Sequence, residues 1–162
     1  MELHSGGNAY HCPVQFNWEK IGIRTRVDKN RLQIFDPFRK RYIYVTPEEE
    51  VRQFTLYRLT RELGYPAATI AVEKQIRYQN LAKRFDILIY DGAQPQLLIE
   101  CKAPDVPLTQ KVFDQLAAYN HVLSVPNVAI TNGKNTVFAQ LKSSPDQYVY
   151  SNDFPPFGSL TF

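Results

Sequence analysis

Three charged residues in the middle of the sequence, Asp86, Glu100 and Lys102, have the chemistry of a metal-dependent phosphodiesterase. Aspartate and glutamate supply the hard oxygen ligands that suit Mg²⁺ or Mn²⁺. A bound ion can activate water and neutralise charge on a scissile phosphate, while a lysine orients the water or stabilises the transition state. These residue types therefore predict phosphodiester hydrolysis, provided that the fold brings the three side chains together.

A β-hairpin is the element that would bring them together. Residues 84–90 and 96–102 have the pattern of strands, and Asp91-Gly92 between them favours a turn. If the hairpin closes symmetrically about Ala93, each residue of the first strand faces the residue equally far from Ala93 on the second. The sequence therefore predicts which side chains are cross-strand neighbours.

In that register Asp86 lies opposite Glu100, with β-carbons within roughly 5.5 Å. Glu100 and Lys102 share a face, because strand side chains alternate between the two faces of a sheet. Two carboxylates at this distance repel unless a cation fills the gap or one of them takes a proton. The three side chains are expected to converge on one spot.

The same charges are also compatible with an ordinary surface hairpin, in which Glu100 and Lys102 pair with unrelated neighbours. A Glu-x-Lys tripeptide is common in proteins and is a weak signal alone. Asp86, however, lies between Phe85 and the apolar residues 87–89, where an acid is out of place. This position favours the site over the surface hairpin.

The rest of the sequence has the pattern of an α/β domain. We expect a hairpin at 31–35 and 41–45, a helix at 47–63, strands at 69–78, 84–90 and 96–102, a helix at 108–123, and strands at 128–131 and 136–141. Thr46 and Pro47 are typical of a helix start. Residues 1–162 would form a single domain, with an irregular extension at 1–30, a core at 31–142 and a tail draped over the body at 143–162.

The charged residues belong to a longer pattern that resembles PD-(D/E)xK nucleases, particularly the branch with a Gln-x-x-x-Tyr signature. In chain order the pattern is Asp86, Glu100-Cys101-Lys102, Gln115 and Tyr119. Three further segments look like the N-terminal nuclease domain of type I restriction enzyme R subunits. They are Thr46-Pro47-Glu48-Glu49-Glu50-Val51-Arg52-Gln53, Glu62-Leu63-Gly64-Tyr65-Pro66 and Lys83-Arg84-Phe85-Asp86-Ile87. The resemblance covers about residues 31–142.

This resemblance implies a restriction-endonuclease-like α/β core, a mixed central sheet flanked by helices, and Mg²⁺-dependent (or Mn²⁺-dependent) cleavage of DNA. Asp86 and Glu100 would be the metal ligands and Lys102 the catalytic lysine. Gln115 and Tyr119, one helical turn apart, would support the site and contact the nucleic acid. Alternatively, Tyr119 is a core residue and Gln115 bonds a neighbouring strand.

The resemblance also implies a glutamate from the first helix. Glu49 lies on the same stripe as Leu56 and Leu63, which places it on the inward side at the helix start. Glu50 is the alternative, because helix starts shift by a residue or two. Either acid could instead stabilise the helix N-terminus by its charge alone.

The sequence departs from the family pattern in two ways. Phe85 precedes Asp86, so the proline-aspartate pair is absent, and no Walker motif is present. We therefore expect a stand-alone nuclease module that does not translocate DNA by itself. A partner protein could supply sequence recognition or a motor, and an oligomer is compatible with the sequence. The alternative function is a non-catalytic DNA-binding or partner-binding module.

Positive charge is concentrated before residue 42. The chain carries a formal charge of +3 and a pI of about 8.8. Eight basic residues fall between 20 and 41: Lys20, Arg24, Arg26, Lys29, Arg31, Arg39, Lys40 and Arg41. This segment is either a phosphate-binding arm or a solvated basic hairpin. We predict DNA contacts from Arg39, Lys40, Arg41 and Arg84.

Other classes of protein fit the sequence poorly. Two cysteines, Cys12 and Cys101, cannot build a disulfide framework, and they lack the spacing of a structural zinc site. No stretch resembles a signal peptide or approaches membrane-spanning length. We therefore expect a cytoplasmic protein without a membrane partner.

Overall fold

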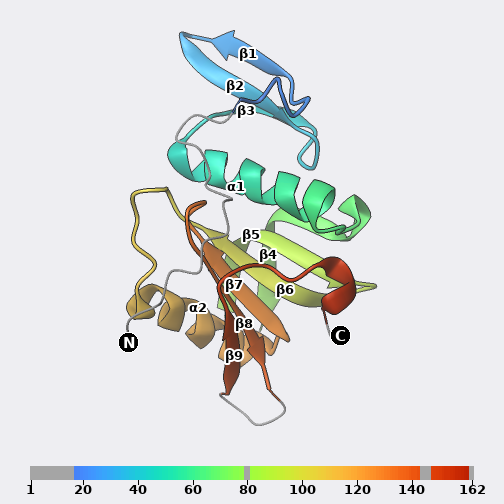
Figure 1. Cartoon of the computed structure of the whole chain (residues 1–162), viewed down its shortest axis with the longest axis vertical. Helices are drawn as coiled ribbons and strands as arrows, with labels where there is room; N and C mark the ends of the chain where they lie inside the picture. The colour runs from blue at the N-terminus through green and yellow to red at the C-terminus, as the bar shows by residue number, and fades with distance from the viewer. Residues whose placement is uncertain (1–16, 79–80, 143–146, 161–162) are drawn as a thin grey trace.

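The computed structural model describes residues 17–78, 81–142 and 147–160, which form a three-stranded sheet, a six-stranded sheet and two α-helices (Figure 1). The elements are β1 (Thr25–Asp28), β2 (Arg31–Asp36), β3 (Arg41–Tyr44), α1 (Pro47–Tyr57), a π-helical turn (Arg58–Glu62), a 3₁₀ turn (Ala67–Thr69), β4 (Ile70–Tyr78), β5 (Leu81–Asp91), β6 (Gln94–Cys101), α2 (Gln110–Leu123), β7 (Asn127–Thr131), β8 (Thr136–Leu141), β9 (Tyr148–Ser151) and a second 3₁₀ turn (Phe157–Ser159).

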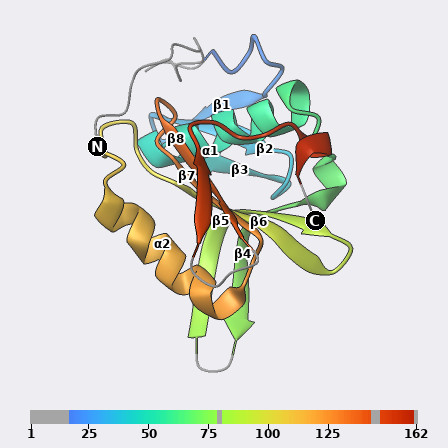
Figure 2. The same ribbon diagram turned by 60° about the horizontal axis from the view of Figure 1, so that its bottom comes forward.

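The larger sheet has the strand order β4-β5-β6-β7-β8-β9. β6 and β7 are parallel, and the other neighbouring strands are antiparallel. Parallel neighbours need a crossover connection, and α2 supplies it. β4 and β5 extend past the other strands as a long hairpin (Figure 2). The α/β class and the mixed central sheet predicted from the sequence are confirmed.

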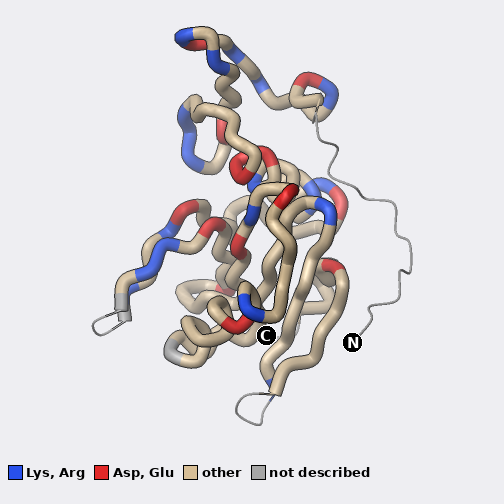
Figure 3. Tube along the Cα trace, turned by 90° about the vertical axis from the view of Figure 1, so that its left-hand side faces the viewer, with Lys and Arg blue, Asp and Glu red and all other residues tan. Residues whose placement is uncertain are grey.

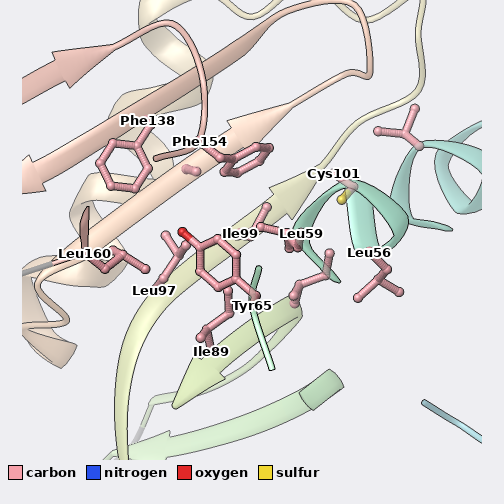
Figure 4. Packing of buried hydrophobic residues seen from close by; sticks show 13 residues of the cluster. Leu56, Leu59, Tyr65, Ile89, Leu97, Ile99, Cys101, Phe138, Phe154 and Leu160 are labelled. Atoms are coloured by element: carbon pink, nitrogen blue, oxygen red, sulfur yellow. The ribbon is translucent and has the colours of Figure 1, made fainter. Parts of the chain in front are cut away.

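One helix packs on each face of this sheet (Figures 1 and 2). On the first face, α1 and the residues after it bury a cluster shown in Figure 4: Val51, Leu56, Leu59, Tyr65, Ile87, Ile89, Leu97, Ile99, Cys101, Ala129, Phe138, Phe154 and Leu160. On the second face, α2 packs on Phe85, Leu88, Leu98, Val128, Ile130 and Ala139 through Phe113 and Leu116. Strands β5 and β6 therefore have buried apolar side chains on both faces of the sheet, which explains the continuous apolar run at 87–89.

The start of α1 follows its sequence signals. The Thr46 hydroxyl accepts a hydrogen bond from the backbone N–H of Glu49 at 3.1 Å, and Pro47 occupies the first turn. The α-helix ends at Tyr57 and continues as the π-helical turn, so the helical segment ends one residue before the predicted Leu63. Gly64, with φ of +76°, then turns the chain away.

The small sheet contains the predicted hairpin as β2 and β3, but it also contains β1. We expected residues 1–30 to be irregular, and β1 corrects this for residues 25–28. Lys29 and Asn30 connect β1 to β2 with φ values of +47° and +60°, which is the geometry of a tight hairpin turn. Lys-Asn lacks the glycine that usually marks such a turn, so the sequence pattern did not reveal the strand. Residues 1–16 of the expected extension lie outside the described residues.

The expected tail adds a strand to the large sheet. β9 pairs with β8, and Phe154 and Leu160 then enter the cluster beneath α1. The tail is therefore an integral part of the core rather than a drape over it, while residues 143–146 and 161–162 lie outside the described residues. In the part of the chain that the structure describes, no helix is long and apolar enough to cross a membrane.

Candidate active site

The β5–β6 hairpin has the predicted register over its central pairs. The facing pairs there are Ile87 with Ile99, Leu88 with Leu98, and Ile89 with Leu97. Nearer the turn the register shifts by one residue at a bulge between Ile89 and Tyr90, and Asp91 pairs with Gln94. The turn is therefore tighter than a symmetrical loop about Ala93, and the bulge compensates for the difference.

Asp86 lies where the ladder between β5 and β6 ends. Both oxygens of its carboxylate accept hydrogen bonds: Oδ2 from the backbone N–H of Cys101 at 2.7 Å, and Oδ1 from Nη2 of Arg52 at 2.6 Å. The side chain is 15% exposed. Asp86 thus joins the end of β6 to helix α1, and its charge is already opposed by a guanidinium.

Glu100 lies beside Asp86 but is held differently. Burial, and next the negative charge of Asp86, raise the pKa of Glu100. The Lys83 ammonium is 3.1 Å from Oε1, yet among the described residues no donor meets this buried oxygen with hydrogen-bond geometry. Glu100 is therefore a carboxylate whose surroundings favour the approach of a further cation or a proton.

Lys102 follows the end of β6. Its backbone N–H donates to the carbonyl oxygen of Thr131 at 2.8 Å, which fixes the chain at this point. Its positive charge lowers the pKa of Glu100, although burial and Asp86 outweigh this effect. Among the described residues no carboxylate oxygen lies within 4.0 Å of the Lys102 ammonium. The ammonium is close enough to influence Glu100 but is not bound to it.

Helix α1 brings Glu49 to Asp86 through Arg52. The guanidinium of Arg52 bonds the carboxylates of both Glu49 and Asp86. Burial alone would lower the pKa of Arg52, but these two carboxylates raise it above its ordinary value. Gln53 also donates to Glu49, at 2.9 Å. Glu49 and Asp86 are therefore held by two different nitrogens of one buried cation.

Glu73 completes the charged cluster from the middle of β4. Its φ is +52°, a left-handed conformation that costs an ordinary residue roughly 1–2 kcal/mol. Arg39 lies 3.1 Å from this carboxylate, and Arg41, Arg52 and Arg84 lie within 3.7–3.9 Å. Burial raises the pKa of Glu73, but Arg39, followed by Arg52 and Arg84, lowers it further than burial raises it. Four guanidinium groups therefore surround a carboxylate that is carried by a strained backbone position.

The four predicted DNA contacts occupy two different environments. Arg39 is 9% exposed, and its guanidinium is ion-paired with the carboxylates of three acidic residues. Its charge is therefore used inside the protein. Lys40 is exposed in the β2–β3 turn, and the side chains of Arg41 and Arg84 are 64% and 67% exposed. These last three remain available to a ligand.

Helix α2 contributes to the cluster through Tyr119. The Lys83 ammonium lies 4.0 Å from the centroid of the Tyr119 ring, in a cation–π contact, while it also faces Glu100. Tyr119 also packs against the second core cluster, as in the core alternative that the sequence left open, and its role in supporting the site stays a prediction. Gln115 is exposed one turn earlier on the same helix.

Three members of the cluster had no role in the sequence analysis: Arg52, Glu73 and Lys83. Arg52 was detectable, because it falls three residues after Glu49 and four before Leu56, on the buried stripe where a charge needs a partner. Glu73 is an acid within an otherwise strand-like segment, which is a weaker signal of the same kind. Lys83 is part of a segment that resembles the R subunits, but nothing in the sequence predicted its contact with Glu100.

The donor set is compatible with a hard divalent cation. Mg²⁺ is commonly held by one or two carboxylates together with water. Glu100 offers a buried oxygen without a hydrogen bond, and Asp86 lies beside it. Within the described residues no three His, Cys, Asp or Glu side chains gather as a closed metal site. The fit is therefore to an open, two-carboxylate site, in which Asp86 would share an oxygen with Arg52.

Comparison with known proteins gives the same outline. The family model described as "Type I restriction enzyme R protein N terminus (HSDR_N)" matches residues 47–155. A fragment structure from Vibrio vulnificus YJ016, described as an HsdR subunit of a type I restriction enzyme, superposes with a TM-score of 0.52 at 19% identity. The match covers 70% of this chain and 24% of that one, and at this identity it shows the fold. No functionally curated protein matches the sequence.

Proposed function

The chain belongs to the type I restriction enzyme R protein N-terminal family, and from this premise we propose that it hydrolyses DNA phosphodiester bonds with Mg²⁺ or Mn²⁺. The observation that carries the proposal is Glu100. Its side chain is 12% exposed, and its pKa is raised by burial and by the carboxylate of Asp86, even though the Lys83 ammonium lies 3.1 Å away. Carboxylates perturbed in this way are frequent at functional sites. A cation bound between Glu100 and Asp86 would offset the repulsion of the two carboxylates.

The proposed roles follow from the contacts. Glu100 and Asp86 would hold the metal ion, which when bound supplies an acidified water and a positive charge against the phosphate. Lys102 would orient the attacking water or stabilise the charge that develops on the phosphate, since its ammonium has no carboxylate within 4.0 Å among the described residues. Arg52 and Glu49 would position Asp86, because they hold one of its two oxygens.

DNA is the proposed substrate. Arg41 and Arg84 are exposed cations beside Glu73, Lys40 is exposed in the β2–β3 turn, and these three would contact backbone phosphates. The chain spans about a quarter (24%) of the matched HsdR fragment structure. Its 162 residues contain no Walker motif. We therefore propose that sequence recognition and any translocation come from other domains or partner subunits of a type I system.

A second candidate function is a DNA-binding or partner-binding module without catalysis. One observation favours it: both oxygens of Asp86 already accept hydrogen bonds, from Arg52 and from the N–H of Cys101. If Arg52 keeps its place, Asp86 has little capacity left for a metal ion. The charged cluster would then be a structural network that holds α1 against β5 and β6.

Cleavage of supercoiled plasmid by wild type and Lys102→Ala separates the two functions. With Mg²⁺ or Mn²⁺ we expect wild type to nick the plasmid, EDTA to stop it, and Lys102→Ala to be slower by about 10²–10³-fold. Calorimetry should show that Lys102→Ala still binds the metal ion. Lys111→Ala, which changes an exposed lysine on α2, is the matched control and should cleave normally. Equal cleavage by Lys102→Ala would refute the assignment, and absence of both cleavage and metal binding in wild type would favour the second function.

A further inference from the structure

One face of the small sheet carries three arginines stacked on three aromatic rings. We call it the arginine–aromatic face, and it consists of Arg24, Arg26, Arg31, Phe35, Tyr42 and Tyr44. The strand register places these residues on one side: Arg26 faces Gln33, Gln33 faces Tyr44, and Phe35 faces Tyr42. The backbone N–H of Phe35 bonds the carbonyl oxygen of Arg24, which adds Arg24 to the same row.

The stacking is regular across the face. The guanidinium carbons of Arg24, Arg26 and Arg31 lie 4.2, 4.0 and 4.2 Å from the centroids of Phe35, Tyr42 and Tyr44 respectively. All three arginines are exposed, and the three rings are half-buried. A guanidinium that lies flat on a ring keeps its N–H edges free to point sideways. Each stack therefore presents donors in a fixed plane.

These three cations are not neutralised inside the protein. Among the described residues, none of the three guanidinium groups has a carboxylate oxygen within 4.0 Å, whereas Arg39 and Arg52 are each ion-paired with several. The acid on the face is Asp28, whose carboxylate accepts the hydroxyl of Tyr44. Arg26 also donates to Gln33 at 2.7 Å, which fixes its direction further.

The strands that carry the face begin beside the candidate active site. At one end of β2 and β3, Asp36 pairs with Arg41, and the turn that follows carries Arg39 to Glu49 and Glu73. From there β2 runs for six residues, or about 20 Å, away from the site. Figure 3 shows the Lys and Arg positions spread along this sheet. The arginine–aromatic face is on the side of this sheet opposite Asp36 and Arg41, so a long ligand leaving the site would reach the stacked arginines by crossing the turn or the edge of the sheet.

We propose that the arginine–aromatic face binds the phosphate backbone of DNA, as a second contact region away from the cleaved bond. The inference rests on the proposed function only in taking DNA as the ligand. Planar guanidinium edges match phosphate oxygens in two-point hydrogen bonds. Because the rings already hold the guanidinium groups, little side-chain freedom is lost on binding. Such contacts position the duplex and do not depend on its sequence.

The test measures binding of a fluorescent DNA duplex by anisotropy in EDTA over a series of KCl concentrations. The variant is the triple change Arg24→Gln, Arg26→Gln and Arg31→Gln. Each lost phosphate contact should flatten the slope of log affinity against log salt by about 0.9, so we expect a change of about 2–3. A second triple variant with lysine at the same positions keeps the charge and should keep most of the slope.

The matched control is Lys111→Gln, Lys134→Gln and Lys142→Gln, which removes the same charge from exposed lysines elsewhere and should leave the slope nearly unchanged. If the control flattens the slope as much as the arginine variant, net charge explains the effect and the inference is overturned. An unchanged slope in the glutamine variant, or no DNA binding by wild type, also overturns it. Should the glutamine triple fail to fold in a thermal melt, Arg24→Gln and Arg31→Gln are each expected to flatten the slope by about 0.9.

Plasmid cleavage with Mg²⁺ distinguishes this inference from the proposed function. If wild type binds DNA through this face but cleaves nothing, the nuclease proposal fails and the inference stands. If wild type cleaves and the glutamine triple keeps the full salt dependence, the nuclease proposal stands and the inference fails.

Discussion

Replacing Asp86 by asparagine tests the bridge between α1 and the end of β6. The change keeps the shape of the side chain, removes its charge and leaves one acceptor oxygen in place of two. Wild-type Asp86 accepts from Arg52 at 2.6 Å and from the Cys101 N–H at 2.7 Å. The asparagine oxygen can satisfy one of these donors, so the other is left without its acceptor.

The expected cost follows from these contacts. A hydrogen bond to a charged group contributes roughly 1.5–3 kcal/mol, and Arg52 and Asp86 are 7% and 15% exposed, so solvent replaces little of it. Loss of the repulsion with Glu100 acts in the opposite direction. We expect a net loss of about 1–2 kcal/mol without metal, or roughly 2–8 °C in Tm for a chain of this length.

Thermal melts in EDTA and in Mg²⁺ measure both effects. Asp91→Asn removes the same charge from the exposed last residue of β5 and should stay within about 0.5 kcal/mol of wild type, because substitutions at exposed positions usually change stability little. Mg²⁺ should raise the Tm of wild type more than that of Asp86→Asn. If Asp86→Asn melts at or above wild type in EDTA, the bridge through Arg52 is not what holds Asp86. Equal Mg²⁺ shifts would show that Asp86 is no ligand.

Three further variants test neighbouring charges. Burial and Asp86 raise the pKa of Glu100, so wild type should lose stability as the pH rises from about 4.5 through the raised pKa. Glu100→Gln should remove this loss, as measured by urea unfolding in EDTA. If the pH profile of Glu100→Gln is the same as that of wild type, the burial argument is contradicted. Neutralising Lys40 and Arg41 together should flatten the slope of log affinity for DNA against log salt by roughly one unit for each residue. Arg39→Gln should instead lower the Tm, because Arg39 is ion-paired inside the protein. A normal Tm for Arg39→Gln would show that its carboxylate partners do not need it.

Local signals made most of the large sheet predictable. Thr46 and Pro47 set the start of α1 because a side-chain cap acts within one turn. The register of β5 and β6 was predicted because alternation and turn position constrain each other. β1 and β9 were missed for the same physical reason: a short edge strand is stabilised by its neighbour in space, and its own residues carry little pattern.

Only part of the candidate site could be predicted from the sequence. Asp86, Glu100 and Lys102 could be assigned to one hairpin, because two strands and the turn between them determine which residues face each other. The cation against Asp86 was assumed to come from solution, whereas the chain itself supplies Arg52. Glu73 gave only a weak signal, because the guanidinium groups that surround it come from three separate parts of the chain. Long-range charge pairing leaves no local periodicity to detect.

The contacts of Arg58 indicate the order in which parts of the fold can form. Its guanidinium bonds Glu62, four residues away, at 3.3 Å, and both oxygens of Asp153, 95 residues away, at 3.0 Å. Closing the longer loop costs about 3 kcal/mol more chain entropy than closing the shorter one. The first bond can form within a single helical segment, but the second must wait until β9 has joined β8. Until then Phe154 is also missing from the cluster beneath α1, so this side of the sheet should close last, and folding should be slow for so small a chain.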